Sequence, residues 1–142
     1  MLSRHGQRGT AMLEFATAAT AIFVGMMGII DFGRTLFTYD LVAHAAQIGT
    51  RYASVRGSSC NTSGCTATST SIATYVKGQV PGVDSTKLGV TTAWSSGNGC
   101  TASPYQGPGC VVSVSVSYPF TLMTYPFSQL TISSRSQFII SQ

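Results

Sequence analysis

Charged residues are scarce in this sequence. Of its 142 residues, eight are Lys or Arg and four are Asp or Glu, whereas 44% are hydrophobic. Intrinsic disorder needs the opposite balance, low hydrophobicity with high net charge, so this composition excludes a largely disordered chain. The net charge of +4 is spread thinly and no run of Lys or Arg occurs. We therefore predict no nucleic-acid partner, because a phosphate backbone is bound by clustered basic side chains.

Residues suited to catalysis are equally few. The chain has two histidines, His5 and His44, and its acids are limited to Glu14, Asp31, Asp40 and Asp84. It contains no Gly-x-Ser-x-Gly, no His-Glu-x-x-His and no phosphate-binding P-loop, the patterns that place a nucleophile, a zinc ion or a nucleotide. We therefore predict that the protein is not an enzyme and that it needs no cofactor and no metal ion.

A long apolar segment follows a short basic start. Residues 1–9 carry Arg4 and Arg8 and no acid, and residues 10–30 hold 15 apolar side chains with Glu14 as the one charge. A helix of this length spans about 30 Å, the thickness of a bilayer core. The positive-inside rule then places the N-terminus in the cytoplasm and everything after Asp31 across the membrane. A cleaved signal peptide is the alternative, but its apolar core is only about 7–15 residues long.

Two features of the apolar segment suggest contacts with other helices. Glu14 costs about 2.5–3.5 kcal/mol if it lies deep in a bilayer, so it is either kept for a positive partner or tolerated near the cytoplasmic interface. Small residues recur at helical spacing at Ala18, Ala21, Gly25 and Gly28. Such a strip permits close helix packing, with a lipid-facing surface as the alternative.

The helical pattern continues beyond the membrane segment and then changes. Large side chains at a spacing of three or four predict an amphipathic helix that runs to Val55: Phe37, Leu41, His44, Ile48, Tyr52 and Val55. A Gly-, Ser- and Thr-rich loop follows at 57–71 and a short helix at 72–80. Strands are expected at 88–94, at 112–118, where Val alternates with Ser, and at 130–140. We expect three or four antiparallel strands packed on the outer half of the long helix.

Four cysteines lie on the far side of the proposed membrane segment, at Cys60, Cys65, Cys100 and Cys110. An even number of cysteines in a small exported head favours disulfides. Zinc sites usually use Cys-x2-Cys spacing with histidine nearby, which is not present here. Three pairings are possible, and we favour Cys60 with Cys65 and Cys100 with Cys110, because each pair would close one polar loop.

The segment Gly9-Thr10-Ala11-Met12-Leu13-Glu14-Phe15 resembles a type IV prepilin processing site. In such sites, cleavage follows the Gly. A Glu occupies the fifth position of the mature chain, and an aromatic residue comes directly after it. The sequences Gly28–Arg34 and Ala45–Ala53, and more loosely Val114–Phe120, are similar to TadE-like pseudopilins of the tight-adherence (Tad/Flp) pilus. The resemblance is closest over residues 4–56, and it does not extend to residues 57–110.

The resemblance implies an α+β, type IV pilin-like fold: a long N-terminal helix, half of it transmembrane, with a small antiparallel β-sheet head held by disulfides. The expected parts are a cytoplasmic leader at 1–9, a transmembrane helix at 10–30, its continuation at 31–56 and the head at 57–142. Gly9, Thr10, Glu14 and Phe15 would form the processing site. Glu14 would also act in subunit assembly, together with Ala18, Ala21, Gly25 and Gly28.

By the same resemblance, the protein is expected to be a minor pilin or pseudopilin needed to assemble or prime an adhesive pilus. Its partners would be a prepilin peptidase, other pilins, the inner-membrane assembly platform and membrane lipid. It would sit in a bacterial inner membrane with a periplasmic head, or in the extracellular pilus. The alternative is an uncleaved, membrane-anchored periplasmic domain that binds a ligand or catalyses a reaction.

Overall fold

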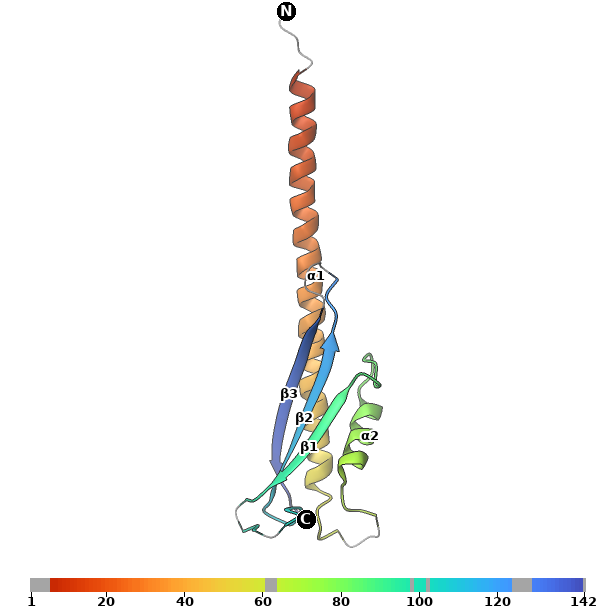
Figure 1. Ribbon diagram of the computed structural model, residues 1–142, viewed down its shortest axis with the longest axis vertical. Helices are drawn as coiled ribbons and strands as arrows, with labels where there is room; N and C mark the ends of the chain where they lie inside the picture. Colours follow the sequence, from red (N-terminus) through yellow and green to blue (C-terminus); the bar gives the residue numbers. More distant parts are fainter. Residues whose placement is uncertain (1–5, 61–63, 98, 102, 124–128, 142) are drawn as a thin grey trace, which may run out of the picture.

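The computed structural model describes residues 6–60, 64–97, 99–101, 103–123 and 129–141, with the side chains of the first helix described from Gly9 onward. Residues 1–5, most of the expected leader including Arg4, lie outside this range. The elements in chain order are α1 (Gly6–Ser54), α2 (Ser69–Gln79), β1 (Gly89–Ser95), β2 (Val111–Phe120) and β3 (Leu130–Ile139). Helix α1 is far longer than the sheet, so its N-terminal half projects alone beyond the head (Figure 1). The α+β class and the long N-terminal helix predicted from the sequence are confirmed.

Helix α1 is continuous because no proline interrupts it. The hydroxyl groups of several of its threonines are hydrogen-bonded to the helix backbone. Thr20, Thr35 and Thr38 each donate to the carbonyl four residues earlier, at 2.8–2.9 Å. This local bond keeps a polar side chain compatible with an apolar helix surface. At the C-terminal end, the free carbonyl of Ser54 accepts from the backbone N–H of Ser141 at 2.9 Å. The end of the chain thus satisfies an acceptor that the helix leaves open.

The second helix begins three residues earlier than the sequence pattern indicated. Thr68 is its N-cap and accepts from the backbone N–H of Ser71 at 3.1 Å, while the Ser71 hydroxyl accepts from the backbone N–H of Thr68 at 2.9 Å. This capping box lies inside the Ser- and Thr-rich stretch that was expected to be loop throughout. The composition alone therefore concealed the helix start, although the Thr-x-x-Ser spacing is a recognisable capping signal.

The three strands form one antiparallel sheet in the order β1-β2-β3, so β2 is central. Val112, Val114 and Val116 of β2 are fully buried, which confirms the alternating pattern seen in the sequence. The intervening Ser113 is buried as well. Its hydroxyl group is hydrogen-bonded there, since it accepts from the Arg135 guanidinium at 3.1 Å and donates to the Ala93 carbonyl at 3.3 Å. The outer face of the central strand is therefore only partly solvated.

Helix α1 buries a different face from the one its large side chains indicated. Phe37 and Val55 are more than half exposed, and His44 is exposed. The face against the sheet and α2 consists of smaller residues: Thr38, Val42, Ala45, Ala46, Gly49, Thr50 and Ala53. Leu41 and Tyr52 of the predicted stripe are partly buried against the core, but the prediction was wrong for Phe37, His44 and Val55, for a steric reason. The sheet and α2 approach the helix so closely that large side chains fit only at the flanks.

Gly49 lies at the closest of these contacts. A Cβ atom there would lie 2.9 Å from Val76 Cγ2 and 3.0 Å from Val114 Cγ1, inside normal van der Waals distance. We expect Gly49→Ala to lower the stability of the head by about 1–3 kcal/mol, the usual cost of overpacking a core. Thermal unfolding of the full chain in detergent, followed by near-ultraviolet circular dichroism, measures the effect.

The matched control is Gly78→Ala in α2, where an added Cβ meets no atom within 4 Å. Alanine has the higher helix propensity, so this change should leave the melting temperature unchanged or raise it slightly. An unaltered melting temperature for Gly49→Ala would contradict the close packing of α1 against α2 and β2.

Candidate functional site

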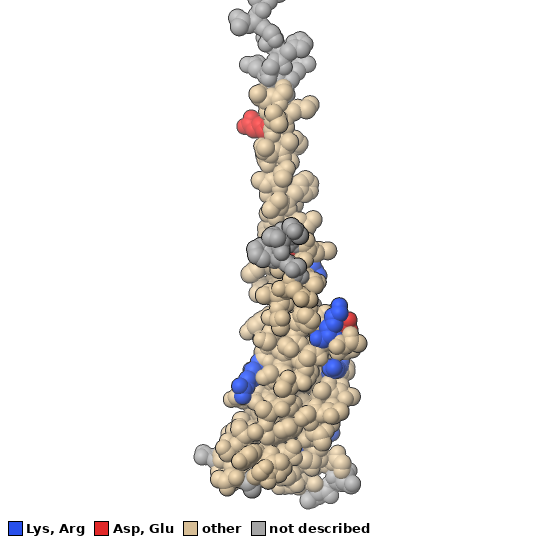
Figure 2. Space-filling view, in the orientation of Figure 1, with Lys and Arg blue, Asp and Glu red and all other residues tan. Residues whose placement is uncertain are grey.

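The N-terminal half of α1 is apolar and uncovered. Within the described residues, α1 is the one helix long and apolar enough to cross a bilayer, and none of its most apolar stretch is buried. Leu13, Phe15 and Phe23, for example, are 68%, 76% and 66% exposed. Figure 2 shows the basic side chains over the half of the molecule that holds the sheet, and mostly uncharged surface along the projecting helix. A surface of this kind is stable only against lipid or against other apolar helices.

The residues expected to form the processing site lie at the start of this projecting helix. Gly9 and Thr10 are both helical and exposed. Glu14 and Phe15 follow one turn later and are also exposed. Among the described residues, the Glu14 carboxylate makes no hydrogen bond or ion pair, although its backbone carbonyl accepts from the Thr17 hydroxyl at 2.9 Å. Among the residues from Gly9 onward whose side chains the structure describes, therefore, Glu14 has no charged neighbour.

The small residues expected to form a packing face are open in the isolated chain. Ala18, Ala21, Gly25 and Gly28 are all exposed, and a Cβ added at either glycine would meet no atom within 4 Å. The head does not use this strip. It is free to meet lipid or a helix of another molecule.

Sequence reasoning missed a polar contact at the junction between the projecting helix and the head. The Asp31 carboxylate is almost completely buried, at 4% exposed, and accepts from the backbone N–H of Met123 with N–O distances of 3.2 and 3.1 Å. Arg34, one turn further along α1, lies 3.4 Å from the same carboxylate and 5.3 Å from the centre of the Phe120 ring. The end of β2 is thereby fixed to α1. The sequence signal for this contact is the position of Asp31, the first acid after the apolar residues 10–30.

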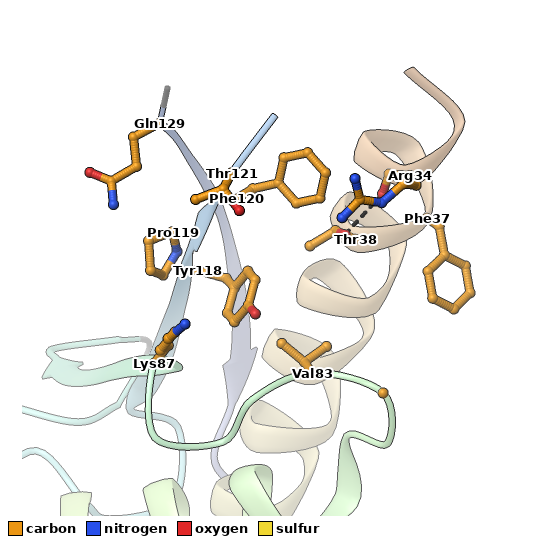
Figure 3. Close-up of a pocket in the computed structure, with 11 residues that line it drawn as sticks. Arg34, Phe37, Thr38, Val83, Lys87, Tyr118, Pro119, Phe120, Thr121 and Gln129 are labelled. Carbon is orange, nitrogen blue, oxygen red and sulfur yellow. Dashed lines mark hydrogen bonds between the residues drawn. The ribbon is translucent and has the colours of Figure 1, made fainter. Parts of the chain in front are cut away.

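A groove of about 480 Å³ lies beside this junction. Its walls come from α1, from the loop before β1 and from the end of β2, with Arg34 and Phe120 on one side and Lys87 and Tyr118 on the other (Figure 3). Each cation already has an acidic neighbour. Lys87 lies 3.9 Å from Asp84, and hydrogen bonds from the side chain and then the backbone of Thr86 lower the pKa of the Asp84 carboxyl. The groove therefore offers little free charge to a ligand.

The cysteines lie at the opposite end of the head, in the loops after α1 and between β1 and β2 (Figure 1). Cys60 pairs with Cys65 and Cys100 with Cys110, at Cα–Cα distances of 5.8 and 5.1 Å. This is the local pairing favoured from the sequence. The backbone N–H of Ser58 donates to the Gln106 carbonyl at 2.8 Å, so the two loops are joined directly. Among the described residues, no group of three or more His, Cys, Asp or Glu side chains is placed to hold a metal ion.

A family model described as "TadE-like protein" matches residues 9–51, all of them within α1. The resemblance predicted from the sequence is confirmed over this segment, whereas the looser similarity of residues 114–120 lies outside the match. Curated proteins and solved structures gave no match to the chain. The matched segment includes the exposed apolar half of the helix, the buried small-residue face and the Asp31 junction.

Proposed function

We propose that this protein, whose residues 9–51 match the TadE-like family model, is a minor pilin or pseudopilin. It would help to assemble or prime a Tad/Flp adhesive pilus. The observation that supports this most directly is the apolar half of α1, which carries a TadE-like sequence and of whose most apolar stretch none is buried. A structural subunit of a helical filament needs such a surface. Its partners would be other pilins or pseudopilins and the inner-membrane assembly platform.

In this proposal the helix first serves as a membrane anchor. Residues 10–30 cross the inner membrane, the basic residues Arg4 and Arg8 stay in the cytoplasm, and the head at 57–142 lies in the periplasm. Residues 31–56 continue the helix and carry the head. Two disulfides suit this location, because the periplasm is oxidising. The subunit would later leave the membrane if it enters the extracellular pilus.

Processing would occur between Gly9 and Thr10, at the cytoplasmic end of the span, by a membrane prepilin peptidase. Both residues are helical in the uncleaved chain. A protease binds its substrate extended, so the first turn must unwind before cleavage. Helix ends fray most easily, and exposed Gly9 lowers the cost further because glycine is a poor helix former. The product would begin at Thr10 and place Glu14 at its fifth position.

Intact-mass measurement of the membrane-extracted and pilus-associated protein tests the proposal. We expect a chain that begins at Thr10, and we expect Gly9→Val to accumulate uncleaved, because a β-branched side chain adds bulk at a position where the small glycine lets an extended chain enter the peptidase. Gly33→Val is the matched control and should be cleaved normally, since it is remote from the site and meets no neighbouring atom. Mature material that retains residues 1–9 would instead favour an uncleaved, membrane-anchored periplasmic domain.

A further inference from the structure

The chain after β2, at residues 121–123, lies beside the part of α1 that is proposed to lie in the membrane. Met123 lines a shallow apolar hollow of about 200 Å³ together with Phe23, Val24 and Met27. These helix residues precede Asp31 by four to eight positions. At a rise of 1.5 Å per residue, Met123 therefore lies beside helix positions about 6–12 Å on the N-terminal side of Asp31.

The side chains at this point suit an apolar environment. Residues 121–123 are Thr, Leu and Met, with no charge. Leu122 packs against the core, whereas Met123 is 72% exposed and lies against Phe23, Val24 and Met27 of the helix. Tyr118, which is partly buried against the core, precedes them, and tyrosine is enriched where a protein meets the bilayer surface.

The backbone N–H of Met123 has a hydrogen-bond acceptor on α1. Irregular backbone at membrane depth is tolerated only when protein satisfies its hydrogen bonds, since lipid offers no donor or acceptor. Both oxygens of the Asp31 carboxylate lie within hydrogen-bond distance of the Met123 N–H, and Arg34 lies beside that carboxylate. The buried acid at the end of the apolar span thus supplies the acceptor that the Met123 N–H would lack in lipid.

We propose that residues 121–123 dip into the outer leaflet of the membrane beside α1, so that the head has a second membrane contact besides its helix. This inference rests on the proposed anchoring of residues 10–30. Lipid is the occupant because Met123 continues the apolar surface of the span itself, on the same molecule. The contact fixes the height and the orientation of the head above the membrane, because a single helix would leave the head free to rotate.

Tryptophan quenching in vesicles tests the insertion. The full chain has one tryptophan, Trp94 in β1, at a distance from the strand end. With Trp94→Phe as background, Met123→Trp should be quenched several-fold by phospholipids that carry a nitroxide on the upper acyl chain. Met123 is exposed, so the substitution should fold normally. The positive control is Phe23→Trp, and the negative control is the unmodified chain with Trp94.

The outcomes separate the two proposals. Quenching of both Met123→Trp and Phe23→Trp, with Trp94 unquenched, supports insertion. If Phe23→Trp is quenched but Met123→Trp is not, the anchor holds and the second contact is wrong. If neither is quenched, residues 10–30 do not span the bilayer and the anchoring itself fails. Equal quenching at Met123→Trp and Trp94 would mean that the whole head lies on lipid, which also overturns the specific contact. Loss of Met123→Trp quenching when protein is concentrated at constant lipid would assign the hollow to a second copy.

Discussion

Glu14→Ala should be cleaved like the wild-type chain yet be lost from assembled pili. The carboxylate is exposed on an apolar helix and has no charged neighbour among the described residues. In lipid this costs about 2.5–3.5 kcal/mol unless a positive group lies nearby. We propose that the free α-amino group of Thr10 on an adjacent processed subunit supplies that charge. Glu14→Ala would leave this α-amino group in an apolar environment without its carboxylate, and since 1.4 kcal/mol corresponds to a factor of ten, incorporation should fall at least tenfold.

Quantitative blotting of sheared pili against membranes, at native expression, measures this ratio. Met12→Ala is the matched control, because it also truncates an exposed side chain in the same turn of α1 but removes no charge. It should assemble nearly normally. Glu14→Gln should resemble Glu14→Ala, because it keeps the size and loses the charge. Normal incorporation of Glu14→Ala would show that the carboxylate has no role in assembly.

Asp31→Ala should release the end of β2 from α1. The substitution removes the acceptor of the Met123 N–H and leaves Arg34 without its acidic neighbour. A hydrogen bond to a charged group contributes about 1.5–3 kcal/mol, and the loss of the neighbouring ion pair with Arg34 adds to it. We expect a loss of about 3 kcal/mol in stability at this junction. Backbone hydrogen exchange around Met123 in detergent or nanodiscs should accelerate by roughly two orders of magnitude.

Asp84→Ala is the control for a lost acid. Asp84 is exposed, and its contacts with Thr86 and Lys87 are local to one turn, so its removal should lower stability far less than Asp31→Ala. Asp31→Asn should give an intermediate effect, because its side-chain oxygen still accepts one hydrogen bond but carries no charge. Unchanged exchange at Met123 in Asp31→Ala would mean that packing alone holds the strand end.

The two variants report on opposite ends of the apolar span. Glu14 is the charge near its start, and Asp31 is the charge at its end. Within one chain Asp31 already has protein partners, whereas Glu14 has none among the described residues. Asp31 should therefore matter for the stability of an isolated subunit and Glu14 only for its assembly, a difference that detergent measurements and pilus assays separate.

The long helix, the central strand and the TadE-like segment were predictable because their signals are local. An apolar run without proline, an alternation of Val and Ser, and the stretch from Gly9 to Phe15 each lie within a short length of chain. Helical and strand periodicities need no knowledge of distant residues. The start of α2 was missed although its Thr-x-x-Ser cap is local too, because the Ser- and Thr-rich composition around it is typical of loops.

The tertiary structure decided which side of α1 is covered and what its acids contact. The size of the side chains pointed to one face, but the sheet and α2 approach so closely at Gly49 that only small residues fit between them. The Asp31 carboxylate meets the N–H of Met123, 92 residues further along the chain. No local pattern encodes that pairing, since it depends on the register of β2 with its neighbouring strands and on how the sheet lies along the helix. The sequence by itself determined the elements and the apolar span, and only their packing made Asp31 the residue that fastens the head to that span.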